Sequence, residues 1–448
     1  MTSSAELTAA LEAMLPGYLP RQRWYSGSDD LGDDGARVVQ TKELASTGDG
    51  SRHLHQVLVE AGGGRYQLLV GERPAGEPAE FLHGHEGAVL GALEHSYLYD
   101  ATLDPELARA LLPVVTGGSE TASRVRPVSA EQSNTSLVYD DRVILKVFRR
   151  LHEGRNPDVE VTTALAGAGF AHVARPVGEW REDDTDLAFA QQFLAGGTEG
   201  WALALTSLRD FYDSGLADPA EAGGDFALEA GRLGRVTAEL HVALAAAFGV
   251  QDDWADGWSA LVDDVGRRLA AFGAEGGAGA PGGSSAEGAL ERLRSVADLG
   301  PAIRVHGDYH LGQVMRTDGG WYVLDFEGEP ARPLEERVRS ASPLKDVAGM
   351  LRSLDYAARF ALIERGDAAD DDPRAPAWVA CNREAFLTGY RAAAEERLLP
   401  GGEAFDLVLA GYELDKALYE LDYEKAYRPS WRPIPAAAIT RIVERLIG

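Results

Sequence analysis

Residues 305–330 read VHGDYHLGQVMRTDGGWYVLDFEGEP and decide the class of fold. The chain turns at Gly307, exposes Asp308 and places Gln313 five residues later, and a second apolar strand, WYVLDF, then delivers Asp325. Phosphoryl transfer requires one carboxylate that orients and deprotonates a hydroxyl, and two oxygen ligands for a magnesium ion that bridges the phosphates. The segment therefore indicates a kinase, with Asp308 as the catalytic base and Gln313 and Asp325 as ligands of Mg²⁺.

A lysine upstream fits the same chemistry. Lys146 lies in VILKVFR, whose alternating pattern is typical of a strand that points one lysine toward the α- and β-phosphates of ATP. Glu160, in NPDVEVTTAL, follows after about one strand-to-helix interval, and we expect it to pair with Lys146, with Asp158 as the alternative partner. Ser133, in EQSNTS, is expected in the phosphate-binding loop, where small polar residues stand in place of several glycines.

The pattern H-G-D-x-H-x-x-Q followed by an aspartate resembles that of the aminoglycoside phosphotransferases and related kinases. Further segments resemble the actinobacterial maltokinases and glucosamine kinases, namely LPRQRWY, EQSNTSLVYDDRVILKVFRR, DFEGEP, SPLKDVAGMLRS and YELDKALYELDYE. The resemblance implies an α+β, bilobal, protein-kinase-like fold with an N-terminal α/β cap domain and a mainly helical C-terminal lobe. It also implies that backbone groups near Gln191, Gln192 and Phe193, in AFAQQFLAGG, read the adenine of ATP.

The chain divides into three predicted domains: a cap at 1–95, a nucleotide-binding lobe at 96–200 and a helical lobe at 201–448. The cap should contain a helix at 4–15 and a hairpin of HQVLVEA and RYQLLVG around three glycines. The second domain should contain the strands SLVYDD, RVILKVFR and DLAFAQQFL around a helix near 158–168. In the helical lobe, GAEGGAGAPGGSSAEG at 273–288 is too poor in apolar residues to order itself, and we expect a mobile loop.

A helical segment at 412–427 carries the candidates for sugar binding. Residues three and four apart share a face of a helix, so its tyrosines form a stripe with acids beside them. Aromatic faces stack on a pyranose ring, and carboxylates accept its hydroxyls or pair with an ammonium group. The candidates for substrate binding are Asp308, Glu413, Asp415, Lys416, Tyr419, Glu420, Asp422 and Tyr423.

Two departures from the maltokinase pattern matter, and the acids of the second favour an amino sugar, whereas Ser28 to Asp30 are interpreted as a surface turn. Maltokinases resemble Q-R-W-[FY]-x-G-K-G-R where residues 22–30 read QRWYSGSDD, and K-A-V-Y-E-V-x-Y-E-A-R-N-R-P where residues 416–429 read KALYELDYEKAYRP. Maltose is neutral, whereas glucosamine carries a positive charge with which an added acid such as Asp422 can form a charge-assisted bond. The expected reaction is phosphorylation of D-glucosamine to glucosamine 6-phosphate, and a maltokinase that forms maltose 1-phosphate is the alternative.

The composition limits the partners. Lys and Arg number 43 against 71 Asp and Glu, and the resulting formal net charge of −28 repels nucleic acid and acidic membrane surfaces. Cys381 is the only cysteine, which excludes an intramolecular disulfide and a multi-cysteine metal site. No apolar run approaches the ~20 residues that cross a bilayer, and the first residues lack the pattern of a signal peptide. We expect a cytoplasmic enzyme whose partners are ATP and a small sugar, with no nucleic acid and no membrane.

Two interpretations from other classes stay open. His306 and His310 could bind zinc together with Asp308 in a metal-dependent hydrolase, although the segment lacks a helical i,i+4 pair of histidines. His306 is otherwise expected to brace the loop. The second alternative is a catalytically inactive, nucleotide-binding pseudokinase, against which the intact set of candidate catalytic residues argues.

Overall fold

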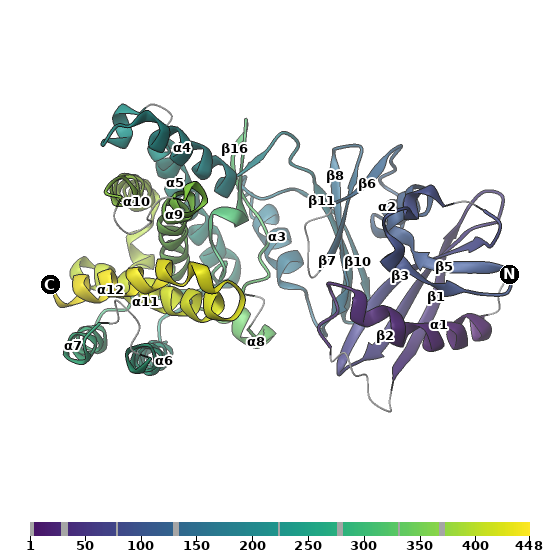
Figure 1. Cartoon of the computed structure of the whole chain (residues 1–448), viewed down its shortest axis with the longest axis horizontal. Coiled ribbons are helices and arrows are strands. Elements are labelled where there is room, and N and C mark those ends of the chain that lie inside the picture. Colours follow the sequence, from purple (N-terminus) through teal and green to yellow (C-terminus); the bar gives the residue numbers. More distant parts are fainter. Residues whose placement is uncertain are drawn as a thin grey trace. The chain divides into compact units, whose positions relative to one another are not determined.

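The computed structural model describes residues 4–27, 35–77, 79–128, 134–222, 225–275, 281–329, 332–366 and 372–448. Ser133 lies outside these ranges, so its predicted role in a phosphate loop stays a prediction. The chain forms two compact units, Met1–Thr163 with Ala174–Ala195, and Ala164–Val173 with Gly196–Gly448. We call the first the sheet unit and the second the helical unit (Figure 1).

The sheet unit begins with an antiparallel sheet that one helix covers. The helix predicted at 4–15 is confirmed as α1 (Ser4–Tyr18), which buries Leu7, Leu11 and Leu15 against the sheet. The predicted hairpin is also confirmed, since β2 and β3 pair around Gly62 and Gly63, whose positive φ values glycine adopts without strain. The strands lie in the order β1 (Ala36–Ser46), β2 (His53–Ala61), β3 (Gly64–Pro74), β5 (Ser96–Asp100) and β4 (Val89–Ala92), with β9 (Arg150–Leu151) also beside β3.

A second antiparallel sheet contains the strands predicted for nucleotide binding. The three predicted strands are confirmed as β7, β8 and β11, and the predicted helix is confirmed as α3 (Pro157–Gly167). Another helix, α2 (Pro105–Val115), packs on this sheet. The strands lie in the order β10 (Pro176–Glu182), β11 (Thr185–Gln192), β8 (Val143–Phe148), β7 (Asn134–Tyr139) and β6 (Val125–Val128).

One hydrophobic core joins the two sheets. Leu54, Leu58 and Leu69 of the first sheet cluster with Leu137 and Leu145 of the second, and α2 adds further leucines. Such a shared core removes apolar surface of both sheets from water at once. This core explains why the predicted cap at 1–95 and most of the predicted lobe at 96–200 lie in one compact unit. The division into three domains stays a prediction.

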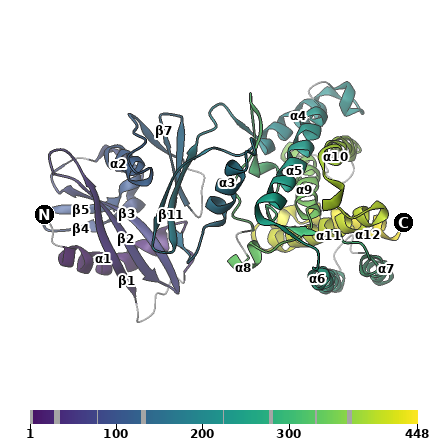
Figure 2. The same ribbon diagram turned by 180° about the vertical axis from the view of Figure 1, so that it is seen from behind.

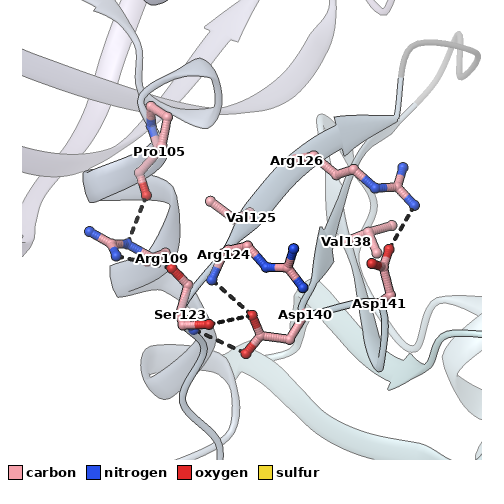
Figure 3. A pocket seen from close by; sticks show the side chains of 9 residues that line it. All are labelled: Pro105, Arg109, Ser123, Arg124, Val125, Arg126, Val138, Asp140 and Asp141. Atoms are coloured by element: carbon pink, nitrogen blue, oxygen red, sulfur yellow. Dashed lines mark hydrogen bonds and ion pairs between the residues drawn. The ribbon is translucent and has the colours of Figure 1, made fainter.

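The edge strand β6 borders a groove of about 410 Å³ (Figure 3). Arg109 of α2 and Arg124 and Arg126 near the start of β6 line it, together with Asp140 and Asp141 from the turn between β7 and β8. Asp140 accepts a hydrogen bond from the backbone N–H of Arg124 at 2.9 Å, and Asp141 accepts one from Arg126 at 3.1 Å. Three arginines and two aspartates therefore line the groove, and one of these arginines, Arg126, is paired with Asp141.

The helix α9 (Leu344–Arg365) lies among the other helices of the helical unit (Figure 2). Most of its side chains are buried. Next to it α5 (Ala227–Phe248) and α10 (Arg374–Ala393) approach closely, because a Cβ at Gly234 or Gly389 would collide with the backbone of the other helix. The strands β12 (Thr198–Glu199), β15 (Val314–Thr317) and β16 (Gly320–Val323) form a small sheet, and β13 (Val250–Gln251) pairs with β14 (Ala302–Ile303). The other helices are α4 (Gly200–Ser214), α6 (Ala255–Ala274), α7 (Gly283–Arg294), α8 (Leu334–Arg337), α11 (Gly402–Tyr427) and α12 (Pro433–Ile447).

The mobile loop predicted at 273–288 is wrong for its second half. The helix α7 begins at Gly283, and residues 276–280 lie outside the described part of the chain. Ala289 and Leu293 of α7 are buried, and α7 packs against α6 and α12. These two side chains lie beyond the low-complexity stretch, and they supply the apolar contacts that its composition lacks. In the described residues, every helix is too short or too polar to span a bilayer.

Candidate active site

One buried carboxylate fixes the loop that follows β14. Asp346, at the start of α9, accepts hydrogen bonds from the backbone N–H groups of His306 and Gly307 at 2.8 and 2.9 Å, and its Oδ2 lies 3.2 Å from Nε2 of His241. Burial raises the pKa of Asp346, but the hydrogen bond and charge of His241 outweigh burial and lower the pKa below its usual value. Sequence reasoning gave Asp346 no role. Its only signal is an acid within an otherwise apolar stretch, LKDVAGML.

His306 lies in the loop in the bracing position expected from the sequence. Its Nε2 lies 2.9 Å from the carbonyl oxygen of Leu324, and its ring packs against Tyr309 and Phe326 with centroid distances of 5.3 and 5.0 Å. Among the residues that the structure describes, no group of three or more His, Cys, Asp and Glu side chains could hold a metal ion. The zinc hydrolase interpretation therefore finds no metal site around His306.

Asp308, the predicted base, is a carboxylate held by an ammonium group. Lys416 of α11 donates hydrogen bonds to Oδ1 of Asp308 at 3.0 Å and to Oε1 of Glu329 at 2.8 Å. The Nε2 atom of His310 lies 3.8 Å from Oδ2 of Asp308, and the ammonium of Lys416 lies 4.9 Å from the ring centre of Tyr419. Burial raises the pKa of Asp308, but the charges of Lys416 and His310 outweigh burial and lower the pKa to about 2. Asp308 is therefore ionised at neutral pH.

The two predicted metal ligands lie next to each other. Nε2 of Gln313 donates a hydrogen bond to Oδ2 of Asp325 at 3.2 Å, and the N–H of Leu324 donates one to the carbonyl of Gln313 at 2.9 Å. Asp325 has a φ of 62°, which is uncommon for a residue other than glycine, and strained backbone of this kind clusters at functional sites. An amide oxygen and a carboxylate are hard donors of the kind that Mg²⁺ prefers. This pair therefore fits the ion, with the amide turned so that its oxygen faces it.

Within the sheet unit, Lys146 of β8 pairs with Asp158 of α3 at 2.8 Å. The expected pairing with Glu160 is corrected, because the ion pair in the structure is with Asp158, the alternative. Residues two apart lie on nearly opposite sides of a helix, and Asp158 is buried while Glu160 is half-buried. The N–H of Asp158 is bonded to Oδ1 of Asn156 at 2.8 Å, which fixes the start of α3.

The three residues expected to read adenine lie at the end of β11. The N–H of Gln192 donates to the carbonyl of Arg175 and that of Phe193 donates to the carbonyl of Arg142, both at 2.8 Å. Gln191 is paired with Ile144 in the ladder between β11 and β8. The N–H groups of Gln192 and Phe193 therefore already have acceptors in the protein. The assignment of this segment to adenine stays a prediction, and it requires a backbone group other than these two.

Most carboxylates of α11 lie in ion pairs with arginine. Glu413 is 3% exposed and pairs with Arg383 and Arg445. Asp415 pairs with Arg268, and Glu420 pairs with Arg352 at 2.6 Å. The predicted helix is confirmed, but these acids contribute less uncompensated negative charge for an ammonium group than the sequence suggested.

Three other predicted sugar-binding residues of α11 differ in exposure. Tyr419 is half-buried beside Lys416, whereas Asp422 and Tyr423 are exposed. The ring of Tyr423 packs against that of Tyr427 with a centroid distance of 4.7 Å. Tyr419 is the tyrosine of this stripe that is linked to Asp308, because Lys416 contacts both of them.

Comparison with known proteins places this site in a family. The family model described as maltokinase N-terminal cap domain matches residues 18–104, and the model described as phosphotransferase enzyme family matches residues 124–380. The chain is 30% identical to a glucosamine kinase of Streptacidiphilus jiangxiensis over 363 residues, which cover 76% of this chain and 78% of the relative. It is 30% identical to a glucosamine kinase of Mycolicibacterium smegmatis over 350 residues, which cover 74% and 82%.

A solved structure agrees in fold. A glucosamine kinase in complex with glucosamine, ADP and inorganic phosphate superposes with a TM-score of 0.68 at 23% identity, over 99% of this chain and 100% of that chain. Fold and site together define a phosphotransferase with the kinase-like fold predicted from the sequence. The chain belongs to the glucosamine kinase family. The family resemblance seen in the sequence is thereby confirmed.

Proposed function

We propose that the chain is an ATP-dependent glucosamine kinase that converts D-glucosamine and ATP into glucosamine 6-phosphate and ADP. The observation that carries the proposal is the ionised, largely buried Asp308 in a loop that also supplies Gln313, with Asp325 beside it. Two relatives that are glucosamine kinases support the choice of sugar. A reaction that consumes ATP fits an enzyme of the cytoplasm.

Asp308 supplies the base of the reaction. Its carboxylate orients the 6-hydroxyl of the sugar and takes its proton as the oxygen bonds to the γ-phosphorus. The bond from that phosphorus to the bridging oxygen breaks, and ADP leaves with the electron pair. Because phosphoryl transfer depends mainly on positioning and charge, a base with a pKa of about 2 serves chiefly by holding the hydroxyl in line.

Three side chains are proposed to act on the nucleotide. Lys146 offsets negative charge on the phosphates, as the lysine of this fold does. Gln313 and Asp325 would hold Mg²⁺, and the bound ion would offset further phosphate charge. Since the N–H groups of Gln192 and Phe193 are bonded within the protein, we place the N–H that reads adenine at Leu194.

The sugar is proposed to lie against α11 near Asp308. The ring of Tyr419 offers an apolar face to the pyranose, and the exposed Tyr423 lies one turn further along the same side of the helix. A maltokinase that forms maltose 1-phosphate is the second candidate, and the match of residues 18–104 to a maltokinase cap favours it. A pseudokinase is disfavoured by the complete set of candidate catalytic residues.

ATP consumption with magnesium, measured side by side on glucosamine, glucose, N-acetylglucosamine and maltose, tests the proposal. We expect turnover of glucosamine, with the phosphate on the 6-oxygen by phosphorus NMR. Asp308→Asn should lose roughly 10²- to 10⁴-fold in turnover, as expected for removal of a positioned base. Asp318→Asn is the matched control, because Asp318 is an exposed turn residue between β15 and β16. A preference for maltose would make the enzyme a maltokinase, and full activity of Asp308→Asn would remove the base.

A further inference from the structure

The ammonium group of Lys416 contacts two carboxylates and one aromatic ring in the helical unit. It donates to Oδ1 of Asp308 at 3.0 Å and to Oε1 of Glu329 at 2.8 Å, and it lies over the ring of Tyr419. The side chains of Lys416, Asp308 and Glu329 are only 19%, 17% and 5% exposed. A lysine ammonium has three donors, so two of the three are committed to carboxylates inside the protein. An ammonium bound in this way has little capacity left for a ligand.

Glu329 and the neighbouring acids of α11 form further ion pairs with arginines. Glu329 accepts a second charge-assisted hydrogen bond, from Nε of Arg332 at 2.5 Å. One turn along α11 from Lys416, Glu420 binds the buried Arg352 at 2.6 Å, and one turn before it, Glu413 binds two arginines. These ion pairs tie α11 to α9, α10 and α12. Lys416 therefore projects from a helix that is fixed on both sides of it.

We propose that Lys416 is a positioning residue for the catalytic base: it binds one oxygen of Asp308, braced by Glu329, and so directs the other oxygen to the sugar hydroxyl. This inference rests on the proposed function, in which Asp308 is the base. It reassigns Lys416, which the sequence analysis grouped with the substrate-binding residues. The two oxygens of Asp308 then have separate roles, since Oδ1 is bound to Lys416 and Oδ2 is 3.8 Å from Nε2 of His310, beyond hydrogen-bond distance.

The geometry has a consequence for the pH dependence of turnover. The base must be ionised to accept the hydroxyl, so activity is lost as pH falls through the pKa of Asp308. Without the charge of Lys416, the effect of burial on Asp308 is left less opposed, and the acid limb must move to higher pH. The charged and titratable groups that face Asp308 or its neighbours Lys416 and Glu329 are His306, His310, Tyr419, Arg332 and Lys345.

The test is the dependence of kcat and kcat/KM on pH, from about pH 3 to about pH 8, a range that includes the ordinary aspartate pKa of about 3.9. Lys416→Met should lower kcat by roughly 10- to 100-fold with a small change in KM for glucosamine, since a misplaced catalytic group costs up to about that factor. Its acid limb should rise by at least about one pH unit, the shift that a lost neighbouring charge produces. Lys416→Arg should restore much of both. Lys425→Met is the control on the same helix, because Lys425 is 54% exposed and pairs with Glu275.

Each contrary result has a defined meaning. An unchanged acid limb with a raised KM in Lys416→Met would overturn the inference and make Lys416 a substrate ligand. Full activity of Asp308→Asn would instead overturn the proposed base, so the two failures are distinguishable. If Lys416→Met does not fold, because Glu329 is left buried with less compensation, the double variant Lys416→Met with Glu329→Gln removes both charges. The same upward shift of the acid limb is expected there, and its absence in the folded double variant would also overturn the inference.

Discussion

Lys146 is buried and Lys416 is half-buried, and both lysines pair with carboxylates, one in each unit, yet their partners differ in kind. Lys146 binds Asp158, in the first turn of α3, at 2.8 Å. Lys416 binds two carboxylates, and one of them is the candidate base. The first pair attaches a strand to a helix, whereas the second fixes an acid that takes part in the reaction.

The difference shows that the role of a buried lysine is set by the groups that it neutralises. Asp158 offsets the charge of Lys146, and both residues lie on secondary structure of the sheet unit. Lys416 lies between two acids, one of which is also neutralised by Arg332. Substitution should therefore affect ATP binding and stability at Lys146, and the orientation of the base at Lys416.

The largest effect in this comparison is expected for Lys146→Met. Loss of a positioned positive charge on the phosphates should lower turnover by roughly 10²- to 10³-fold and raise KM for ATP. The protein should also be destabilised by about 3–5 kcal/mol, because Asp158, only 1% exposed, stays buried without this partner.

The double variant Lys146→Met with Asp158→Asn separates the two effects. It should recover most of the free energy of unfolding in urea but none of the turnover. If turnover returned together with stability, Lys146 would have only a structural role.

Asp325→Asn should have the next largest effect. The carboxylate is the charged member of the proposed magnesium pair, so the Mg²⁺ concentration for half-maximal turnover should rise by at least about tenfold, a change typical of a disturbed metal site. Titration of activity with Mg²⁺ at fixed ATP measures it, and Asp318→Asn on the same hairpin should leave it unchanged. An unchanged requirement for Mg²⁺ in Asp325→Asn would place the ion elsewhere.

Residues that act within one short segment could be predicted from the sequence. The motif at 305–330 supplies Asp308, Gln313 and Asp325, and the structure places Gln313 and Asp325 3.2 Å apart. The family fold and the helix α11 followed from pattern and resemblance in the same way. Residues within one short segment can be brought together by local structure alone, so these site residues could be predicted without knowledge of long-range contacts.

Contacts between distant segments could not be predicted. Lys416 and Asp308 are 108 residues apart, and Asp346 is 40 residues from His306. Neither the composition nor the hydrophobic periodicity of the sequence indicates that the acids of α11 form ion pairs with arginines of other helices. The low-complexity stretch before α7 was misjudged for the same reason, since the order of α7 depends on packing against α12.

Asp346→Asn should have a smaller effect on turnover than either earlier change. One buried N–H of the loop loses a charged acceptor, so we expect a loss of about 1–3 kcal/mol in the free energy of unfolding and a modest fall in kcat. Because the pKa of Asp346 lies below its usual value, its contribution is complete above the unfolded value of about 3.9 and is lost as pH falls further.

Urea unfolding at several pH values measures this contribution. The asparagine variant should show a smaller loss of stability on acidification than the wild type. Asp406→Asn, at a side chain 71% exposed, is the control and should be neutral. Equal acid sensitivity of Asp346→Asn and wild type would show that Asp346 is not ionised in the folded protein.

The smallest effect is expected for Asp422→Asn, and it bears on the choice of sugar. Asp422 is the acid that the sequence singled out for ammonium recognition, but it is exposed and lies six residues beyond Lys416, about 120° around the helix. Stability should change by no more than about 0.5 kcal/mol, and the ratio of kcat/KM for glucosamine over glucose should stay the same. Tyr419→Ala, next to the base, should raise KM for both sugars. If Asp422→Asn instead lost its preference for glucosamine, the amino group would be read on the outer face of α11, away from Lys416, and both lysines of the comparison would be excluded from sugar recognition.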